Sequence, residues 1–523
     1  MRSVGRYFHA FWPLTVESIM RTYKTNSIGS TFSTLMILIV VLLINISAAI
    51  AQSETKINAD NPWRFAYFGY SVSISGDYAV VGAYSKYSGS AYIFIREGDN
   101  WNQQAELIAD DAAEGNQFGV SVSISGDYAV IGDRSNDDDD TGSAYIFVRD
   151  GTDWTQQAKL TADDAEEGDW FGYSVSISGD YSIIGAVYDD DSGSSSGSAY
   201  IFARDGADWT QQSKLTADDA ASGEVFGYSV SISDDYAVIG ASGLTSRDSG
   251  SAYIFVQNGD GWTQQAKLTA DDAAVEDRFG CSVSISGDYA IVGASQDDDG
   301  GGSSGSAYIF VRDGEDWTQQ AKLTVDDAEA GDRFGYSVSI SGDNAVIGAL
   351  FGHNGVEYAG SAYIFVIEGD DWTQQVKLTT DDATREDAFG RSVSISGDYA
   401  IVGVPFAGGD IGPSEGSAYI YNQFENGIEW RGDLADFPGE FFISEAYPNP
   451  FNSTTTITYG LPGPGGVSLQ LYNLSGQLIN TLFEGNRQAG IYSANLVGKN
   501  LASGLYFVRL EGAGQVVARK IML

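Results

Sequence analysis

The chain has 523 residues and a formal net charge of −43, from 71 Asp and Glu against 28 Lys and Arg. Such an excess of carboxylates repels phosphate backbones and anionic bilayers, which excludes nucleic-acid binding and peripheral membrane attachment. The single cysteine, Cys281, excludes an intrachain disulfide.

The N-terminal segment, residues 1–51, is typical of a signal peptide. Basic residues precede an apolar core at residues 35–44, and small residues follow it before Gln52. This core is too short for a membrane span, which needs about twenty residues. We therefore predict export and a mature chain that begins at Gln52 and has no membrane span. The long lead before the core indicates that translation could begin at Met20.

A repeat of 50 to 55 residues dominates the rest of the chain. Each copy contains the pair Phe-Gly at the start of a strand-like run. A fixed period of this length with short β-segments is typical of a closed ring of four-stranded blades. We predict an all-β fold, a seven-bladed β-propeller over residues 52–435. The seven repeats are marked by Phe68, Phe118, Phe171, Phe226, Phe279, Phe334 and Phe389.

The third repeat illustrates the four strands expected in each blade. Phe171–Ile177 alternates large and small residues and is predicted to be the innermost strand, with its Gly and Ser face against the neighbouring blade. Tyr181–Ala186 follows a tight turn, Gly197–Phe202 follows a variable loop, and the more polar Trp209–Leu215 is the outer strand.

Alternating strand directions separate the connections onto two faces of the ring. One face, here the turn face, carries the constant Ser-Gly-Asp and Arg-Asp-Gly turns. The opposite face, the loop face, carries the second-to-third loops and the blade-to-blade loops, with most of the variation in length. Because loops on a rigid scaffold carry binding diversity, we expect function on the loop face.

Closure of the ring has two candidate strands. Residues 56–60 align without gaps on the Lys-Leu-Thr-Ala-Asp of later repeats and read as an outer strand detached from its blade. We favour this N-terminal segment as the strand that completes the last blade and leaves no open sheet edge. Residues 430–434 compete for the same place.

Runs of aspartate lie in three second-to-third loops. Clustered carboxylates with Gly and Ser suit a calcium cage, although none of the runs forms a complete EF-hand loop, and a solvated acidic loop is the alternative. These runs are the candidate binding residues and the candidate calcium ligands: Asp137, Asp138, Asp139, Asp140, Asp189, Asp190, Asp191, Asp297, Asp298 and Asp299.

Other repeated features favour structural roles. Asp-Asp pairs in the blade-to-blade loops are predicted to cap turns, and the tryptophan that begins each outer strand is predicted to pack. His353 is the only histidine of the mature chain, which excludes histidine triads and multi-histidine metal sites. We therefore expect a protein without catalytic activity.

The pattern FGYSVSISGDYAVIGA resembles the FG-GAP repeats of integrin α-subunit propellers and their bacterial relatives, over about residues 55–435. The resemblance implies a propeller that binds ligands on the face of its blade-to-blade loops. In integrins the first hairpin often carries a calcium loop. Here that hairpin has shrunk to Ser-Gly-Asp, so the family's calcium sites do not carry over.

Residues 443–523, after a linker at 436–442, resemble the C-terminal sorting domain of the type IX secretion system of Bacteroidetes-type bacteria. The motifs are YPNPFNSTTTITYGLP, LYNLSGQLINTL, AGIYSANL and SGLYFVRL. The resemblance implies export to the cell surface or medium by that machinery, which would be one partner of the chain. Alternating strands with Gly and Pro turns predict a small immunoglobulin-like β-sandwich.

These observations predict a secreted or surface adhesion protein that binds an extracellular protein or glycan through its loop face and acts as a monomer. Near-identical blades would allow weak contacts to add up. The alternative is a secreted polysaccharide-degrading hydrolase or lyase on the same scaffold.

Overall fold

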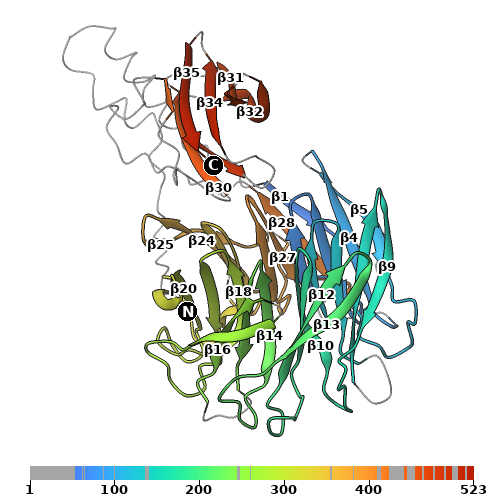
Figure 1. Ribbon diagram of the computed structural model, residues 1–523. Helices are drawn as coiled ribbons and strands as arrows, with labels where there is room; N and C mark the ends of the chain where they lie inside the picture. Colours follow the sequence, from blue (N-terminus) through green and yellow to red (C-terminus); the bar gives the residue numbers. More distant parts are fainter. Residues whose placement is uncertain are drawn as a thin grey trace, which may run out of the picture. The chain divides into compact units, whose positions relative to one another are not determined.

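The computed structural model contains two compact units, residues 1–427 and 428–523 (Figure 1). Its described residues are 53–61, 63, 65–85, 87–98, 100–135, 141–243, 248–259, 261–353, 356–380, 382–408, 414–422, 441–443, 454–461, 465–474, 477–487, 490–497, 504–512 and 515–522. All regular elements among them are β-strands. None of this described part forms a helix that could cross a membrane. The predicted signal peptide lies outside it.

The first unit is built from seven four-stranded antiparallel sheets, which confirms the predicted blades. The strands of the first four blades are β2 (Ser71–Ser75), β3 (Tyr78–Ala83), β4 (Ser90–Glu97), β5 (Asn100–Leu107); β6 (Ser121–Ser125), β7 (Tyr128–Asp133), β8 (Ser143–Asp150), β9 (Asp153–Leu160); β10 (Phe171–Ser178), β11 (Tyr181–Ala186), β12 (Ser198–Asp205), β13 (Asp208–Leu215); and β14 (Phe226–Ser233), β15 (Tyr236–Ala241), β16 (Ser251–Asn258), β17 (Gly261–Leu268). Those of the next two are β18 (Phe279–Ser286), β19 (Tyr289–Ala294), β20 (Ser306–Asp313), β21 (Asp316–Leu323); and β22 (Phe334–Ser341), β23 (Asn344–Ala349), β24 (Ser361–Glu368), β25 (Asp371–Leu378).

The seventh blade is completed by the N-terminus. It has the strand order β1-β28-β27-β26, with β26 (Ser392–Ser396), β27 (Tyr399–Val404) and β28 (Ser417–Asn422). The strand β1 (Ser53–Ile57) pairs antiparallel with β28, and Figure 1 shows the two side by side. The N-terminal candidate for closure is therefore confirmed. The competing residues 430–434 lie outside the described residues.

The core of the ring lies between blades rather than inside them. Seven hydrophobic clusters each combine side chains of two neighbouring blades, and one joins the last blade to the first through Ile401, Ile420, Phe68 and Ile57. The first strand of each blade contacts the first strands of both neighbours, so these strands surround the axis as predicted. Burial of a continuous interblade core holds the ring together.

Serine and glycine allow the blades to approach closely near the axis. In the third blade, Ser174 Oγ donates a hydrogen bond of 2.8 Å to the carbonyl of Gly227 in the next blade. Ser123 Oγ of the second blade accepts one of 3.2 Å from the amide of Ile177. The Phe-Gly pair needs its glycine for two reasons, as Gly227 illustrates. Its φ of +86° is one that other residues rarely adopt, and a Cβ there would lie 2.4 Å from the carbonyl oxygen of Ser198. The face of small residues predicted for this strand therefore also forms hydrogen bonds between blades.

The second unit contains two antiparallel sheets. One has β29 (Phe442–Ile443), β30 (Thr454–Leu461) and β33 (Gly490–Val497); the other has β31 (Gly465–Asn473), β32 (Leu478–Arg487), β34 (Leu505–Gly512) and β35 (Gln515–Met522). Apolar side chains of both sheets, such as Tyr459 and Leu469, share one core. The immunoglobulin-like assignment of these sheets stays a prediction.

Candidate functional site

The two faces of the propeller are separated as the sequence predicts. On the turn face, the arginine that ends a third strand pairs with the aspartate of the first turn in its own blade, as Arg149 does with Asp127. The Arg149 guanidinium also stacks on Tyr78 of the preceding blade at 4.6 Å. On the loop face, the second-to-third and blade-to-blade loops meet: the amide of Gly223 donates to the carbonyl of Ser194. Ion pairs and cation–π contacts of this kind stabilise the turn face.

The aspartate pairs of the blade-to-blade loops are interblade ion pairs. In each pair the second aspartate binds the lysine near the end of the next blade's outer strand. Six such contacts of 2.5 to 2.7 Å surround the ring, and the last uses the N-terminal strand: Asp111–Lys159, Asp164–Lys214, Asp219–Lys267, Asp272–Lys322, Asp327–Lys377 and Asp382–Lys56. These aspartate pairs have a structural role, as the sequence predicts. Their main partner, however, is a lysine of the next blade and not a backbone amide of the turn.

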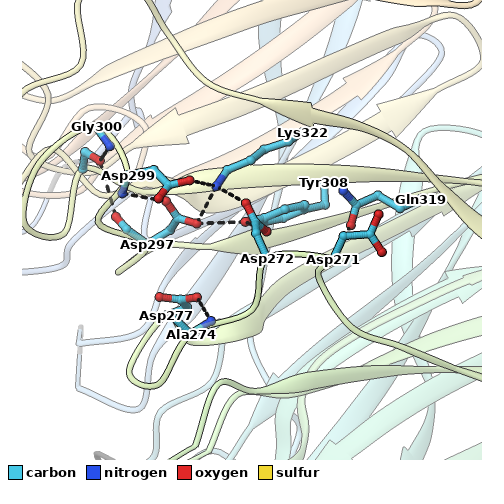
Figure 2. A network of polar contacts seen from close by, with 11 residues as sticks. Asp271, Asp272, Ala274, Asp277, Asp297, Asp299, Gly300, Tyr308, Gln319 and Lys322 are labelled. Carbon is cyan, nitrogen blue, oxygen red and sulfur yellow. Dashed lines mark hydrogen bonds and ion pairs between the residues drawn. The ribbon is translucent and has the colours of Figure 1, made fainter.

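Two of the predicted aspartate runs converge on these same lysines. Lys322 Nζ lies 2.6 Å from Asp272, 3.0 Å from Asp297 and 2.5 Å from Asp299, and Figure 2 shows how these side chains converge. Tyr308 donates a further hydrogen bond of 2.8 Å to Asp297. Lys214 makes the equivalent contacts in the third blade with Asp164, Asp189 and Asp191, at 2.5 to 2.8 Å. The carboxyl oxygens of each triad lie within 4.8 Å of one another, close enough to share one cation.

The charge state of these clusters follows from the contacts. Burial disfavours the charged form of Lys322, but its hydrogen bonds with three aspartates outweigh burial and raise the pKa of the ammonium group. Partial burial likewise acts to raise the pKa of Asp272, yet the Lys322 contact lowers it. An ammonium group therefore lies at the centre of each triad at neutral pH.

The remaining predicted aspartates differ in placement. Asp190 and Asp298 are exposed, whereas Asp189 and Asp297 are buried. Asp137, Asp138, Asp139 and Asp140 lie outside the described residues. The lysine that six of the seven outer strands carry is not among the predicted partners, although Lys and the second Asp recur together in the repeats. That joint recurrence is the signal that could have revealed the pairing.

Removal of the central lysine should create a calcium site that the wild-type protein does not need. We expect Lys322→Gln to lose roughly 2–4 kcal/mol of stability in chelator, because it leaves the buried Asp297 carboxylate without its counter-charge. Calcium should restore much of this loss, since three carboxylates then share one cation. Urea unfolding with calcium or chelator measures the effect.

Lys267→Gln is the matched control because Lys267 has an ion pair with a single aspartate, Asp219, among the described residues. This variant should show no calcium dependence. If wild-type stability itself falls in chelator, the ammonium group is not the resident cation and the calcium hypothesis for these loops gains support.

A cavity of about 160 Å³ lies at the axis of the propeller, where the inner strands begin. Since the blade-to-blade loops lead into these strands, the cavity belongs to the loop face. Its wall is formed by the residue that follows Phe-Gly in each of the seven blades: Tyr70, Val120, Tyr173, Tyr228, Cys281, Tyr336 and Arg391. Arg134, Arg278 and Arg333 also line it.

Uncharged groups hold three of the four arginines of this axial pocket. Arg333 lies over the Phe351 ring at 5.0 Å. Arg391 lies over the Tyr70 ring at 3.9 Å and donates a hydrogen bond of 2.7 Å to the Tyr336 hydroxyl. Arg134 donates to Gln117 at 2.8 Å and lies over Trp170 at 4.7 Å. Aromatic faces stabilise guanidinium groups without neutralising them.

A buried carboxylate lies next to the pocket residue Arg134. Asp133 ends β7 at a position where five of the other six blades carry alanine, and its side chain is fully buried. It accepts a hydrogen bond of 2.8 Å from the Gln117 amide. Burial nevertheless dominates and raises the pKa of Asp133 from 3.8 to about 6.

This shift predicts a stability that depends on pH. The Asp133 carboxyl retains its proton to higher pH in the folded than in the unfolded chain. The contribution of Asp133 to stability therefore falls as pH rises from about 4 to about 6 and is constant above. Asp133→Asn should therefore gain about 3 kcal/mol at pH 8 and nothing below pH 4. Urea unfolding across this range checks it. Asp190→Asn, an exposed aspartate, should show no such trend, and an equal gain at all pH values in Asp133→Asn would contradict the mechanism.

Comparison with known families agrees with this geometry. The ring of near-identical blades with a loop-lined axial cavity defines a β-propeller of the repeat type. The chain belongs to the FG-GAP repeat family, whose model matches residues 52–94, 101–147, 154–202, 209–255, 262–310, 317–365 and 372–421.

The model of the secretion system C-terminal sorting domain matches residues 445–523. The chain is therefore exported by the type IX system to the cell surface or the extracellular space, and this domain interacts with the secretion machinery. No curated protein matches the chain significantly.

Proposed function

We propose that this exported propeller is a non-enzymatic binding protein that recognises an extracellular protein or glycan through its loop face. The observation that carries the proposal is the axial pocket, a concave site on the face where loop variation gathers. Concave sites with a few convergent polar groups are where ligands bind in rigid folds.

The chemistry of the pocket favours binding over catalysis. Arginine stays protonated at all accessible pH values and cannot act as a general base. Burial raises the pKa of both Tyr173 and Tyr228, and it raises that of the Cys281 thiol, so none of the three is a ready base or nucleophile at neutral pH. The residues that line the pocket in the described part of the chain include no carboxylate and no histidine.

Arrays of glycans and extracellular proteins test the proposal with the purified mature chain. We expect saturable retention on at least one class of target and no release of products from it. Release of sugar products would instead favour the polysaccharide-degrading alternative.

Blocking one face at a time tests the location. The Cys281→Ser background changes a residue of the pocket wall, so it must first be shown to bind as the wild type does. In this background, Ser194→Cys on the loop face or Ala207→Cys on the turn face is coupled to a large polyethylene glycol; both positions are exposed. The loop-face conjugate should lose binding and the turn-face conjugate should retain it. The opposite pattern would contradict a site on the loop face.

A further inference from the structure

Four guanidinium groups converge on the axis from four different blades. Arg134 follows β7, Arg278 and Arg333 directly precede β18 and β22, and Arg391 directly precedes β26. They come from distant parts of the sequence and meet only because the ring closes. Such a concentration of positive charge is unexpected in a chain of net charge −43.

Among the described residues of the propeller, these arginines are the cations that lack a carboxylate partner. Among its described residues, each of the other lysines and arginines has an ion pair with Asp or Glu: Lys56, Arg96, Arg149, Lys159, Arg204, Lys214, Lys267, Arg312, Lys322, Lys377 and Arg385. Arg134, Arg278, Arg333 and Arg391 have none within the same described part. Four unneutralised charges around one cavity repel one another, and an anion in the cavity would relieve that repulsion.

The pocket is already arranged for such an anion. Aromatic rings and a tyrosine hydroxyl hold Arg391, and Trp170 and Gln117 hold Arg134. Guanidinium groups that are fixed before binding lose little entropy when an anion arrives, and their planar forks match carboxylates and sulfates.

The other residues of the pocket wall favour a ligand whose anionic group belongs to a sugar. Tyr173, Tyr228 and Tyr336 add aromatic rings with hydroxyl groups to the wall, which suit a ligand that is apolar on its faces and polar at its rim. The cavity volume suits one small ring rather than a long chain segment. A polyanion would be repelled by the acidic surface outside the pocket, so the ligand should carry an isolated charge.

We propose that the axial pocket binds an isolated acidic sugar of an extracellular glycan, with the arginines around its carboxylate or sulfate group and the tyrosines against its ring. This inference rests on the proposed binding function and names the ligand class of the same site. Uronic acids and sulfated sugars share the required chemistry.

Calorimetry on the mature chain tests the ligand class with defined probes. The probes are oligosaccharides that end in glucuronic acid, in a sulfated galactose, or in the matching neutral sugars. We expect at least one acidic probe to bind tenfold or more tightly than its neutral counterpart, and the two acidic arms to show which anion is preferred. Inorganic sulfate and acetate test whether the anion suffices without the sugar.

Variants locate the site. Arg278→Gln changes an exposed side chain and Arg333→Gln a partly exposed one, so both should fold, and each should weaken acidic-sugar binding fivefold or more. Arg385→Gln is the matched control: it removes an arginine of a blade-to-blade loop that pairs with Glu357 and Glu386 instead of lining the pocket, and binding should be unchanged.

The outcomes separate this inference from the broader function. Equal affinity for neutral and acidic sugars, equal binding of free inorganic anions, selective binding of peptides with a free C-terminal carboxylate, or equal losses in Arg278→Gln and Arg385→Gln would each overturn the acidic-sugar proposal while a binding role stands. Failure to bind any glycan or protein would overturn both. Cleavage of a bound acidic glycan would overturn the non-enzymatic function and leave the ligand class intact.

Discussion

Deletion of Ser53–Ile57 should open the ring and lower the stability of the propeller by about 5 kcal/mol or more. The five residues of β1 pair with β28 along its length. Ile57 is buried in the core between the last and first blades, and Lys56 pairs with Asp382. Loss of several backbone hydrogen bonds at about 1 kcal/mol each and of one buried isoleucine at 2 kcal/mol or more accounts for the magnitude.

The deletion should also promote association, because it exposes the edge of β28 to other chains. Urea unfolding and light scattering measure the two effects. A synthetic peptide of residues 52–60 should restore both stability and the monomeric state. Lys56→Ala is the control: it removes one partly exposed ion pair and should cost less than about 1 kcal/mol.

An unchanged stability of the deletion would mean that another segment closes the last blade. Residues 430–434, the second candidate from the sequence, would then be the first to examine. Deletion of both segments would test this alternative. A loss of stability only in the double deletion would identify residues 430–434 as a closing strand.

The architecture could be predicted because every blade repeats the same local information. The run from Phe171 predicts a strand that ends at Ile177, and β10 ends one residue later. The strand β11 has the bounds that its turn and its apolar residues predict. Even the detached outer strand could be identified, since its residues align with those of complete blades. Repetition turns a weak strand signal into a strong one.

The site could not be predicted in the same way, because its residues depart from the repeat in three different positions. Arg278 and Arg333 precede Phe-Gly, Arg391 follows it, and Arg134 follows the second strand. Each is an isolated exception within its own repeat, and only the closed ring brings them together. The aspartate runs are visible in the sequence as charge clusters, whereas their lysine partners come from another strand of the same blade.

Gly240→Ala should destabilise the propeller by about 3 kcal/mol. The only cause should be a clash between the new methyl group and the next blade. Gly240 lies in β15, and a Cβ there would be 2.0 Å from the backbone carbonyl oxygen of Gly280 in the next blade and 2.3 Å from Ser229 Oγ. Its φ is not in the left-handed region, so the effect has no contribution from backbone strain. Overpacking of a rigid interface costs typically 1–3 kcal/mol, and more where backbone must move.

Gly261→Ala provides the comparison within the same blade. Gly261 begins the outer strand β17, its φ is also ordinary, and no atom lies within 4 Å of the position of its Cβ. This change should be neutral or stabilise by up to about 1 kcal/mol, because alanine restricts the unfolded chain. Urea unfolding of the two variants isolates the interblade contact. Equal stabilities of the Gly240→Ala and Gly261→Ala variants would mean that the blades can separate near the axis. Equivalent glycines occur in all seven blades, so this outcome would also contradict the fixed geometry on which the arginine pocket depends.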